Sequence, residues 1–130
     1  MNYLAHAYLS FKHPGILAGN MISDFVKGKK RYDYPLPVQQ GISLHREIDR
    51  FTDTHVATRG AKEIFREAYR LYSAALVDVL YDHFLAADET EFNEESLDLF
   101  AKDTYHSLDQ FADIFPEKFN KMYPFMKKQN

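Results

Sequence analysis

The chain has no cysteine and no tryptophan among its 130 residues. Without cysteine it has no disulfides, thiolate zinc sites, iron–sulfur clusters or cysteine nucleophiles, which leaves His, Asp and Glu as the strong metal ligands. No apolar run approaches the roughly 20 residues that cross a bilayer, and residues 1–30 lack the basic-then-apolar order of a signal peptide. We therefore expect a cytoplasmic protein without a membrane partner.

The chain also lacks an excess of positive charge. Its formal net charge is -3, which gives no bulk attraction to nucleic acid, so we expect no nucleic-acid partner. Hydrophobic residues make up 45% and charged residues 27% of the chain, with 11 Phe and 9 Tyr. This composition predicts a single helical domain over residues 1–130, with a core built on large rings.

The apolar residues recur at helical spacing nearly throughout, without the alternation typical of strands. The pattern predicts an all-α helical bundle of about six helices. Pro14, Pro37 and Pro116 suit helix starts, and Gly28 suits a helix end. The predicted segments are 2–12, 14–28, 37–53, a stretch from about 54 to 87 with a break near Tyr69, 94–113 and 116–127, with a loop at 28–35.

Three of these segments carry polar residues on an otherwise apolar face. In the segment 37–53 the stripe consists of Val38, Ile42, His45, Asp49 and Thr52. If the stretch 54–87 is one continuous helix, Ile64, Ala68, Leu71 and Ala75 lead into Asp78 and Asp82, with His83 beside them. In the second segment Leu17, Asn20 or Met21, and Asp24 align in the same way.

Carboxylates and imidazoles gathered in an apolar interior need a physical reason. Ionised Asp side chains there cost several kcal/mol unless a divalent cation offsets the burial. Taken singly, the pairs have simpler explanations: His45 and Asp49 could be a helix-surface pair, and His6 a core histidine. Their joint occurrence favours a buried divalent metal site.

Four blocks of sequence are specific enough to compare with a known family. They are MNYLAH at 1–6, GNMISDFVKG at 19–28, GISLHREIDRFTDTH at 41–55 and VDVLYDHFLA at 77–86. In this order and spacing they resemble the acyl carrier protein phosphodiesterases. The resemblance implies an all-α fold distantly related to the HD-domain phosphohydrolases and a manganese or magnesium cofactor. It also implies a role in fatty acid metabolism, the removal of 4′-phosphopantetheine from holo acyl carrier protein as protein substrate.

Carried over position by position, the resemblance implies metal ligands at His45, Asp49, Asp82 and His83. It implies catalytic groups at Asp24, His6, Asp53 and His55. It implies a contact with substrate at Asn20. From their charge we expect Arg46 and Lys27 to bind phosphate oxygens, and Lys29, Lys30 and Arg31 to contact the partner. Asp24 is either a further ligand or the carboxylate that orients water, and the division between ligands and bases stays open. Carrier proteins are small and acidic, so we expect them to bind at the basic cluster of Lys27, Lys29, Lys30 and Arg31.

The resemblance is incomplete, because members of the family continue for several dozen residues after a Trp-Leu segment that is absent here. We therefore expect a C-terminally shortened chain whose last helices expose aromatic rings and favour a homodimer. The rings are Phe111, Phe115, Phe119, Tyr123 and Phe125. Two alternatives remain open: an HD-type phosphohydrolase acting on another phosphodiester or a nucleotide, and an inactive helical module that binds the carrier protein.

Overall fold

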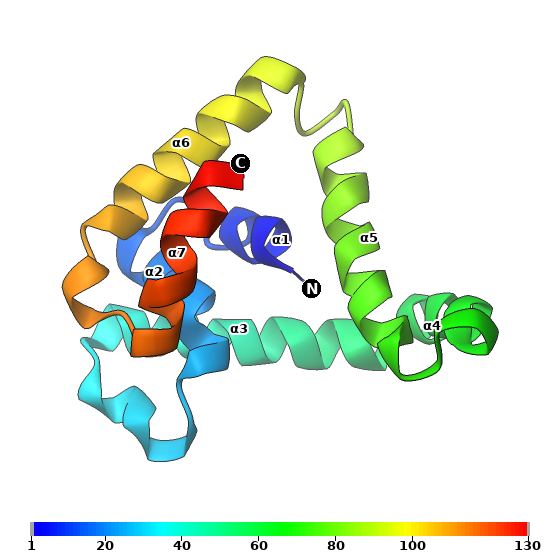
Figure 1. Ribbon diagram of the computed structural model, residues 1–130, viewed down its shortest axis with the longest axis horizontal. Coiled ribbons are helices and arrows are strands. Elements are labelled where there is room, and N and C mark those ends of the chain that lie inside the picture. Colours follow the sequence, from blue (N-terminus) through cyan, green and yellow to red (C-terminus); the bar gives the residue numbers. More distant parts are fainter. Residues whose placement is uncertain (1, 130) are drawn as a thin grey trace.

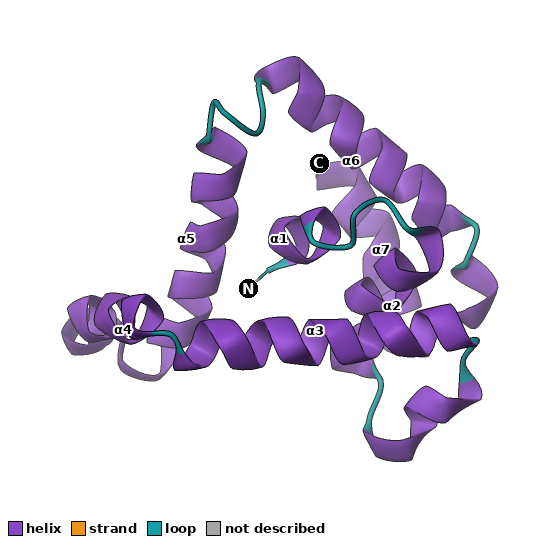
Figure 2. Ribbon diagram, turned by 180° about the vertical axis from the view of Figure 1, so that it is seen from behind, coloured by secondary structure: helices purple, strands orange, loops and turns teal. Residues whose placement is uncertain are grey.

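The structure is a computed structural model that describes residues 2–129. Within these residues the chain forms seven α-helices, four short 3₁₀ segments and no strand, which confirms the all-α prediction (Figure 2). The α-helices are α1 Tyr3–Tyr8, α2 Pro14–Ile22, α3 Leu36–Thr54, α4 Val56–Tyr69, α5 Ser73–Ala87, α6 Glu94–Asp109 and α7 Glu117–Gln129. The 3₁₀ segments are η1 Ser23–Phe25, η2 Gly28–Asp33, η3 Arg70–Tyr72 and η4 Ala112–Ile114.

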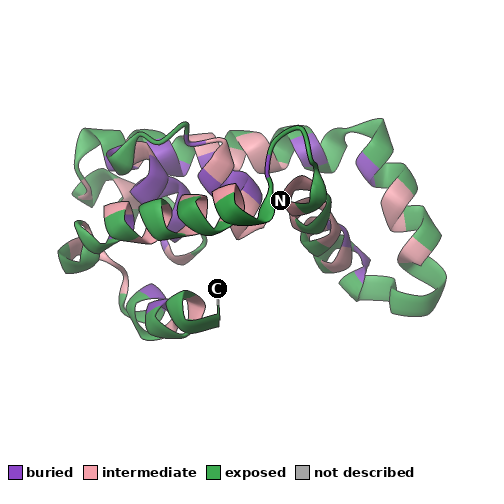
Figure 3. Ribbon diagram, turned by 90° about the horizontal axis from the view of Figure 1, so that it is seen from above, coloured by how far each residue is buried: buried purple, intermediate pink, exposed green. Residues whose placement is uncertain are grey.

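The long helices form an open triangular frame (Figure 1). Helix α3 forms one side, α5 rises from the far end of α3 beyond α4, and α6 forms the third side. Helix α1 lies inside the frame, and α2 packs along α3 at the corner opposite α4. Buried residues gather where α1, α2 and α3 meet, whereas the arm of α4 and α5 is mostly exposed (Figure 3).

Local sequence signals explain most of the helix boundaries. Pro14 occupies the first turn of α2, and the side chain of His13 accepts a hydrogen bond from the Ile16 backbone N–H at 3.3 Å. Asn93 and Ser96 form a capping box that starts α6. The expected break near Tyr69 is present as well, because Arg70 adopts a φ of 45° and separates α4 from α5.

The expected length of the first helix is wrong, and the continuous helix on which the stripe over 54–87 depended is absent. The first helix ends at Tyr8 because Phe11 and Lys12 have φ values of 50° and 62°, and Phe11 is 78% exposed. The break after α4 also prevents a continuous stripe leading to Asp78 and Asp82. Ile64 and Leu71, which were expected on that stripe, are 78% and 94% exposed.

Helices α2 and α3 form the most extensive contact between any two helices of residues 2–129. An ideal Cβ atom built on Gly19 would lie 2.0 Å from the Val38 carbonyl oxygen, and one built on Gly41 would lie 2.1 Å from the Ile16 carbonyl oxygen. The two backbones therefore touch directly, which only glycine permits at these positions. This contact sets the distance between the residues that follow each glycine on its helix.

The aromatic residues near the C-terminus mostly pack inward, which corrects the expectation that they are left exposed. Phe119 is 0% and Tyr123 6% exposed, and Phe111 and Phe115 pack against the same core cluster. Of the five rings expected at the surface, Phe125 is the exposed one. None of the helices between residues 2 and 129 combines the length and the hydropathy of a membrane span.

A polar anchor joins α6 to α7, and we expect its removal to lower stability. Asp109 accepts hydrogen bonds from Lys127 Nζ at 2.8 Å and from the Tyr123 hydroxyl at 2.8 Å. Replacing Asp109 by Asn should lower the free energy of unfolding by about 1 kcal/mol at pH 7, as measured by urea denaturation. Asp103→Asn, an exposed position on the same helix, is the control and should leave stability unchanged.

The effect of Asp109→Asn should depend on pH. The Lys127 ammonium lowers the pKa of Asp109 below its ordinary value of 3.8; burial opposes this shift and the bond from Tyr123 supports it. A carboxyl whose pKa is lower in the folded than in the unfolded state stabilises the fold fully above the unfolded value. The difference between wild type and variant should therefore persist at pH 5–8 and shrink as the pH falls below about 4. A difference that grows in acid would contradict this account.

Candidate metal centre

Two histidines and one carboxylate meet at the junction of α1 and α3. His6 and His45 stack with ring centroids 3.8 Å apart and an angle of 8° between the rings. Asp49 faces both rings: its Oδ1 lies 3.1 Å from His6 Nε2, and its Oδ2 lies 3.2 Å from His45 Nε2. One ligand atom from each of the three residues lies within 4.8 Å of the others. Asp24 adds a fourth group, with Oδ1 at 3.2 Å from His45 Nε2.

Hydrogen bonds account for only part of this convergence: His6 Nε2 and Asp49 Oδ1 are hydrogen-bond partners, whereas His45 Nε2 has none. His45 Nε2 is buried and makes no hydrogen bond of acceptable geometry, although two carboxylate oxygens lie 3.2 Å away. Adjacent ligands of an octahedral cation with bonds of about 2.1 Å are about 3.0 Å apart. The spacing around His45 Nε2 is therefore close to that of ligands sharing an ion.

The contact between α2 and α3 fixes the orientation of His45. Asn20 follows Gly19 on α2, and its backbone carbonyl oxygen accepts a hydrogen bond from His45 Nδ1 at 2.7 Å. Because a carbonyl can only accept, the Nδ1 atom carries a proton, and Nε2 is the nitrogen turned toward the carboxylates. A histidine held in this way is a common arrangement in metal sites.

The side chain of Asn20 holds His6 on the other side. Its amide nitrogen donates to the His6 carbonyl oxygen and to Ser10 Oγ, each at 3.0 Å, and Ser10 Oγ donates to the same carbonyl at 2.8 Å. Asn20 is 0% exposed. Asn20 thus links the positions of both histidines, one through its backbone and the other through its side chain.

The charges of this group are strongly coupled. Burial lowers the pKa of His45, but the carboxylates of Asp24 and Asp49 outweigh it and raise the pKa from 6.5 to about 9. Burial raises the pKa of Asp49, and the contacts with His45 and His6 outweigh that effect and hold it far below its ordinary range. The close approach of the His45 ring is also the main reason for the lowered pKa of Asp24. The site therefore stabilises positive charge at His45 Nε2, where a cation would replace the proton.

The group opens onto a hollow of about 330 Å³ on the protein surface. Its lining includes Asp24, His45 and Asp49 together with the cations Lys27 and Arg46. Arg46 Nη2 donates to the Val26 carbonyl oxygen at 3.1 Å, which holds the guanidinium beside the hollow. A hollow lined by two carboxylates, an imidazole and two cations suits a phosphate group next to a divalent ion.

Four other residues expected in the site, on α5 and near the end of α3, are not part of this group. Asp82 and His83 are on α5: Asp82 accepts hydrogen bonds from the backbone of α1, and His83 is exposed and stacks edge-on against Phe84. Asp53 and His55 are exposed near the end of α3. Asp53 lies 3.8 Å from Lys62 Nζ, and the His55 ring accepts from the Ala57 N–H and caps α4.

The basic cluster consists of Lys27, which lines the hollow, and three residues of η2 that follow it. Lys27, Lys29 and Lys30 are exposed, and Arg31 is partly exposed with its guanidinium 4.9 Å from the centre of the Tyr32 ring. The cluster is therefore accessible and contiguous with the side of the hollow that Lys27 lines.

Sequence reasoning did not identify the residues that hold the site together. Gly19, Gly41 and Ser10 bear no ligand atom, yet they position Asn20, His6 and His45. The available signal was the presence of two glycines inside segments that otherwise favour helix, because glycine weakens a helix unless a close backbone contact requires it.

The chain is similar to the proteins of one family along its whole length. The profile of the family "Acyl carrier protein phosphodiesterase" matches residues 1–130. The chain belongs to the acyl carrier protein phosphodiesterase family. A family relative of that name from Photorhabdus laumondii subsp. laumondii is 33% identical over 131 residues, which cover 100% of this chain and 66% of the relative. Relatives of the same name from Salmonella agona and Salmonella newport are 39% identical over 95 residues.

The matches leave part of each relative uncovered. The two Salmonella alignments cover 73% of this chain and 49% of the relatives, so the chain spans between about half and two thirds of the family members it matches. No solved structure shows a significant match to the chain.

The residues of this family member fit a divalent cation. Two imidazole nitrogens and a carboxylate can bind a divalent metal. The nitrogens favour zinc, and the carboxylate is the ligand type that manganese and magnesium prefer. The buried Nε2 atom of His45, which lacks a hydrogen bond, supplies the observation that favours an ion there. His6, His45 and Asp49 would hold the ion, with Asp24 beside it on the solvent side.

Proposed function

We propose that this chain is a metal-dependent phosphodiesterase that removes 4′-phosphopantetheine from holo acyl carrier protein and leaves apo acyl carrier protein. The observation that carries the proposal is the group of His6, His45 and Asp49, buried at its base and open to a hollow edged by Lys27 and Arg46. Membership of the family supplies the substrate class. The cytoplasmic location expected from the sequence belongs to this proposal.

The position of each side chain in the site determines its role in the reaction. A bound divalent ion supplies charge neutralisation at the phosphoryl oxygens and acidifies water beside them. Asp24 is 67% exposed at the mouth of the site, so it can accept a proton from water that approaches from solvent. Arg46 and Lys27 face the same hollow and can bind non-bridging phosphate oxygens, which places phosphorus next to the water that attacks it.

The basic cluster is the surface at which the acidic carrier protein binds. Lys29, Lys30 and Arg31 continue the positive edge of the hollow along η2. An acidic partner approaching this surface would bring its serine-linked phosphate toward Asp24 and Arg46. Charge complementarity of this kind acts chiefly on the rate of encounter and weakens with salt.

Intact mass spectrometry of the carrier protein tests the proposed activity. Purified chain is incubated with holo acyl carrier protein and Mn²⁺, and the proposal predicts loss of the prosthetic-group mass from the carrier. Omission of metal with added chelator is the control and should abolish the loss. A metal-saturated, folded protein that leaves the carrier intact but binds it would favour the inactive binding module instead. Turnover of a nucleotide or another phosphodiester, without turnover of the carrier, would favour the general phosphohydrolase.

Reversal of the basic cluster should weaken substrate capture selectively. We expect the variant with Lys29, Lys30 and Arg31 changed to Glu to raise KM for holo carrier protein about tenfold or more at low salt, with kcat and Mn²⁺ affinity nearly unchanged. The control reverses three lysines elsewhere on the surface, Lys102, Lys118 and Lys121, and has the same net charge. An equal rise in KM for both variants would show that net charge, and not this surface, guides the encounter.

A further inference from the structure

Helix α1 carries His6 but lacks a cap of its own. It has only six residues, from Tyr3 to Tyr8, a length that is not stable as an isolated helix. Asn2 occupies the N-cap position with an extended backbone (φ −113°, ψ −171°), yet its side chain makes no capping hydrogen bond. The first N–H groups of α1 therefore depend on another part of the chain.

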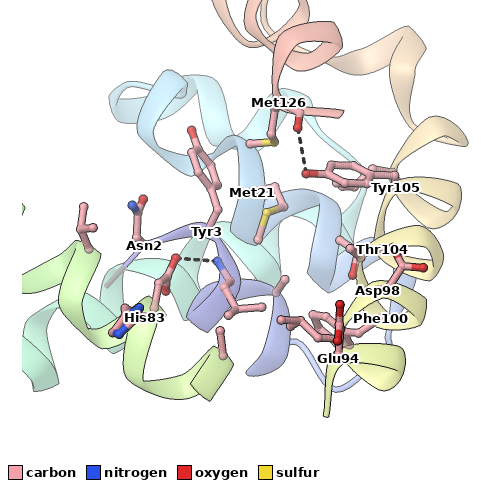
Figure 4. A pocket seen from close by; sticks show the side chains of 18 residues that line it. Asn2, Tyr3, Met21, His83, Glu94, Asp98, Phe100, Thr104, Tyr105 and Met126 are labelled. Atoms are coloured by element: carbon pink, nitrogen blue, oxygen red, sulfur yellow. Dashed lines mark hydrogen bonds between the residues drawn. The ribbon is translucent and has the colours of Figure 1, made fainter. Parts of the chain in front are cut away.

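Asp82 makes the capping hydrogen bonds that the Asn2 side chain does not make. Its Oδ2 atom accepts a hydrogen bond from the Leu4 N–H and its Oδ1 atom accepts one from the Ala5 N–H, both at 2.9 Å (the dashed line beside Tyr3 in Figure 4 is one of them). Leu4 and Ala5 are the second and third residues of α1, whose N–H groups an N-cap side chain normally binds. The carboxylate comes from α5, 78 residues away from Leu4 in sequence.

The capped turn leads directly to a metal-site histidine. His6 follows Ala5, is 2% exposed, and points its Nε2 atom at Asp49. Asn20 holds the carbonyl end of the same residue. Asp82 and Asn20 thus secure the turn that carries His6 from two sides, one through N–H groups and the other through a carbonyl.

We propose that Asp82 is a positioning residue that caps α1 from α5 and thereby holds His6 Nε2 at the ion site. Both oxygens of the carboxylate are engaged by backbone N–H groups, so its contribution to the site passes through the backbone of α1 and not through the ion. This inference rests on the proposed metal-dependent function for its catalytic consequence. The capping role itself can be measured without metal.

The test compares Asp82→Ala with the double variant Asp82→Ala plus Asn2→Asp. A carboxylate at position 2 can bind the same two N–H groups from the N-cap position, so it restores the cap without restoring a carboxylate on α5. Three quantities are measured: amide hydrogen exchange of Leu4 and Ala5, the ¹⁵N shift of the His6 ring in metal-free protein, and Mn²⁺ affinity. Asp82 of α5 and Asp98 of α6 line one cavity of about 570 Å³, so Asp98→Ala, which removes another carboxylate of that cavity, is the matched control.

The proposal predicts a linked loss and rescue. Asp82→Ala should accelerate exchange at Leu4 and Ala5, shift the His6 ring signal and weaken Mn²⁺ binding about tenfold, and Asn2→Asp should restore all three. Asp98→Ala should change none of them. Asp82→Asn, which keeps the shape and one acceptor oxygen, should protect one of the two amides and provides the test if the Ala variant does not fold.

Two results would overturn the proposal. Unchanged exchange at Leu4 and Ala5 in a folded Asp82 variant would show that the cap has no energetic role. Loss of Mn²⁺ binding that the restored cap does not rescue would show that Asp82 binds the ion itself. If wild type binds no Mn²⁺, the proposed function fails, whereas exchange at the two amides and the His6 ring shift still decide whether Asp82 positions α1.

Discussion

Replacing Asp49 by Asn should abolish metal-dependent activity. Asp49 faces both His6 and His45, so the variant loses the carboxylate that joins the two imidazoles to one ion. We expect Mn²⁺ affinity to fall by more than about a hundredfold and turnover of holo carrier protein by about a thousandfold or more. Mn²⁺ should raise the melting temperature of wild type and leave that of the variant unchanged. Calorimetric titration and thermal unfolding measure these effects.

Glu47→Gln is the control for this experiment. Glu47 lies on the same helix, is exposed, and pairs with Arg50 on the outer face of α3. Its neutralisation removes the same charge and should leave Mn²⁺ affinity and turnover at the wild-type level. An Asp49→Asn variant that keeps wild-type Mn²⁺ affinity would remove this residue from the metal centre.

Replacing Gly41 by Ala should damage both the fold and the site. The added Cβ atom would lie 2.1 Å from the Ile16 carbonyl oxygen and 2.9 Å from the Asn20 backbone nitrogen, both of which are backbone atoms that cannot rotate away. We expect a loss of about 3 kcal/mol or more in the free energy of unfolding, and a fall of about 10 °C in melting temperature. Separation of α2 from α3 would also break the hydrogen bond between Asn20 and His45.

Gly60→Ala separates this effect from the general cost of changing a helical glycine. Gly60 lies on the exposed part of α4, and a Cβ atom there meets nothing within 4 Å. Its replacement should raise stability by about 0.5–1 kcal/mol, because alanine favours helix over glycine. Gly41→Ala that is equally harmless would show that the helices can move apart and that the close contact is not required.

Helix positions were largely predictable because their signals are local. Pro14 and the Asn93 region mark helix starts through backbone constraints that act within a few residues. The first helix was predicted too long because its end depends on the positive φ values of Phe11 and Lys12, which neither residue type favours. Ile64 of α4 and Leu71 of η3 were misplaced because helical spacing identifies a face but not what covers it, and both side chains are exposed here.

The site was predictable in part for the same physical reason. His45 and Asp49 are four residues apart on one helix, so spacing alone places them on the same face. The position of His6 against Asp49 depends on the packing of α1 on α2, which no local pattern encodes. The hydrogen bonds of Asp82 to α1 likewise join residues 77 and 78 positions apart, and only the tertiary structure shows them.

Anomalous scattering from a crystal of the protein soaked in Mn²⁺ tests the central claim most directly. The account predicts a single strong peak at bonding distance from His6 Nε2, His45 Nε2 and an oxygen of Asp49, with Asp24 on its solvent side. Protein shown by titration to be saturated with Mn²⁺, but with the peak elsewhere and these three side chains unligated, would contradict it.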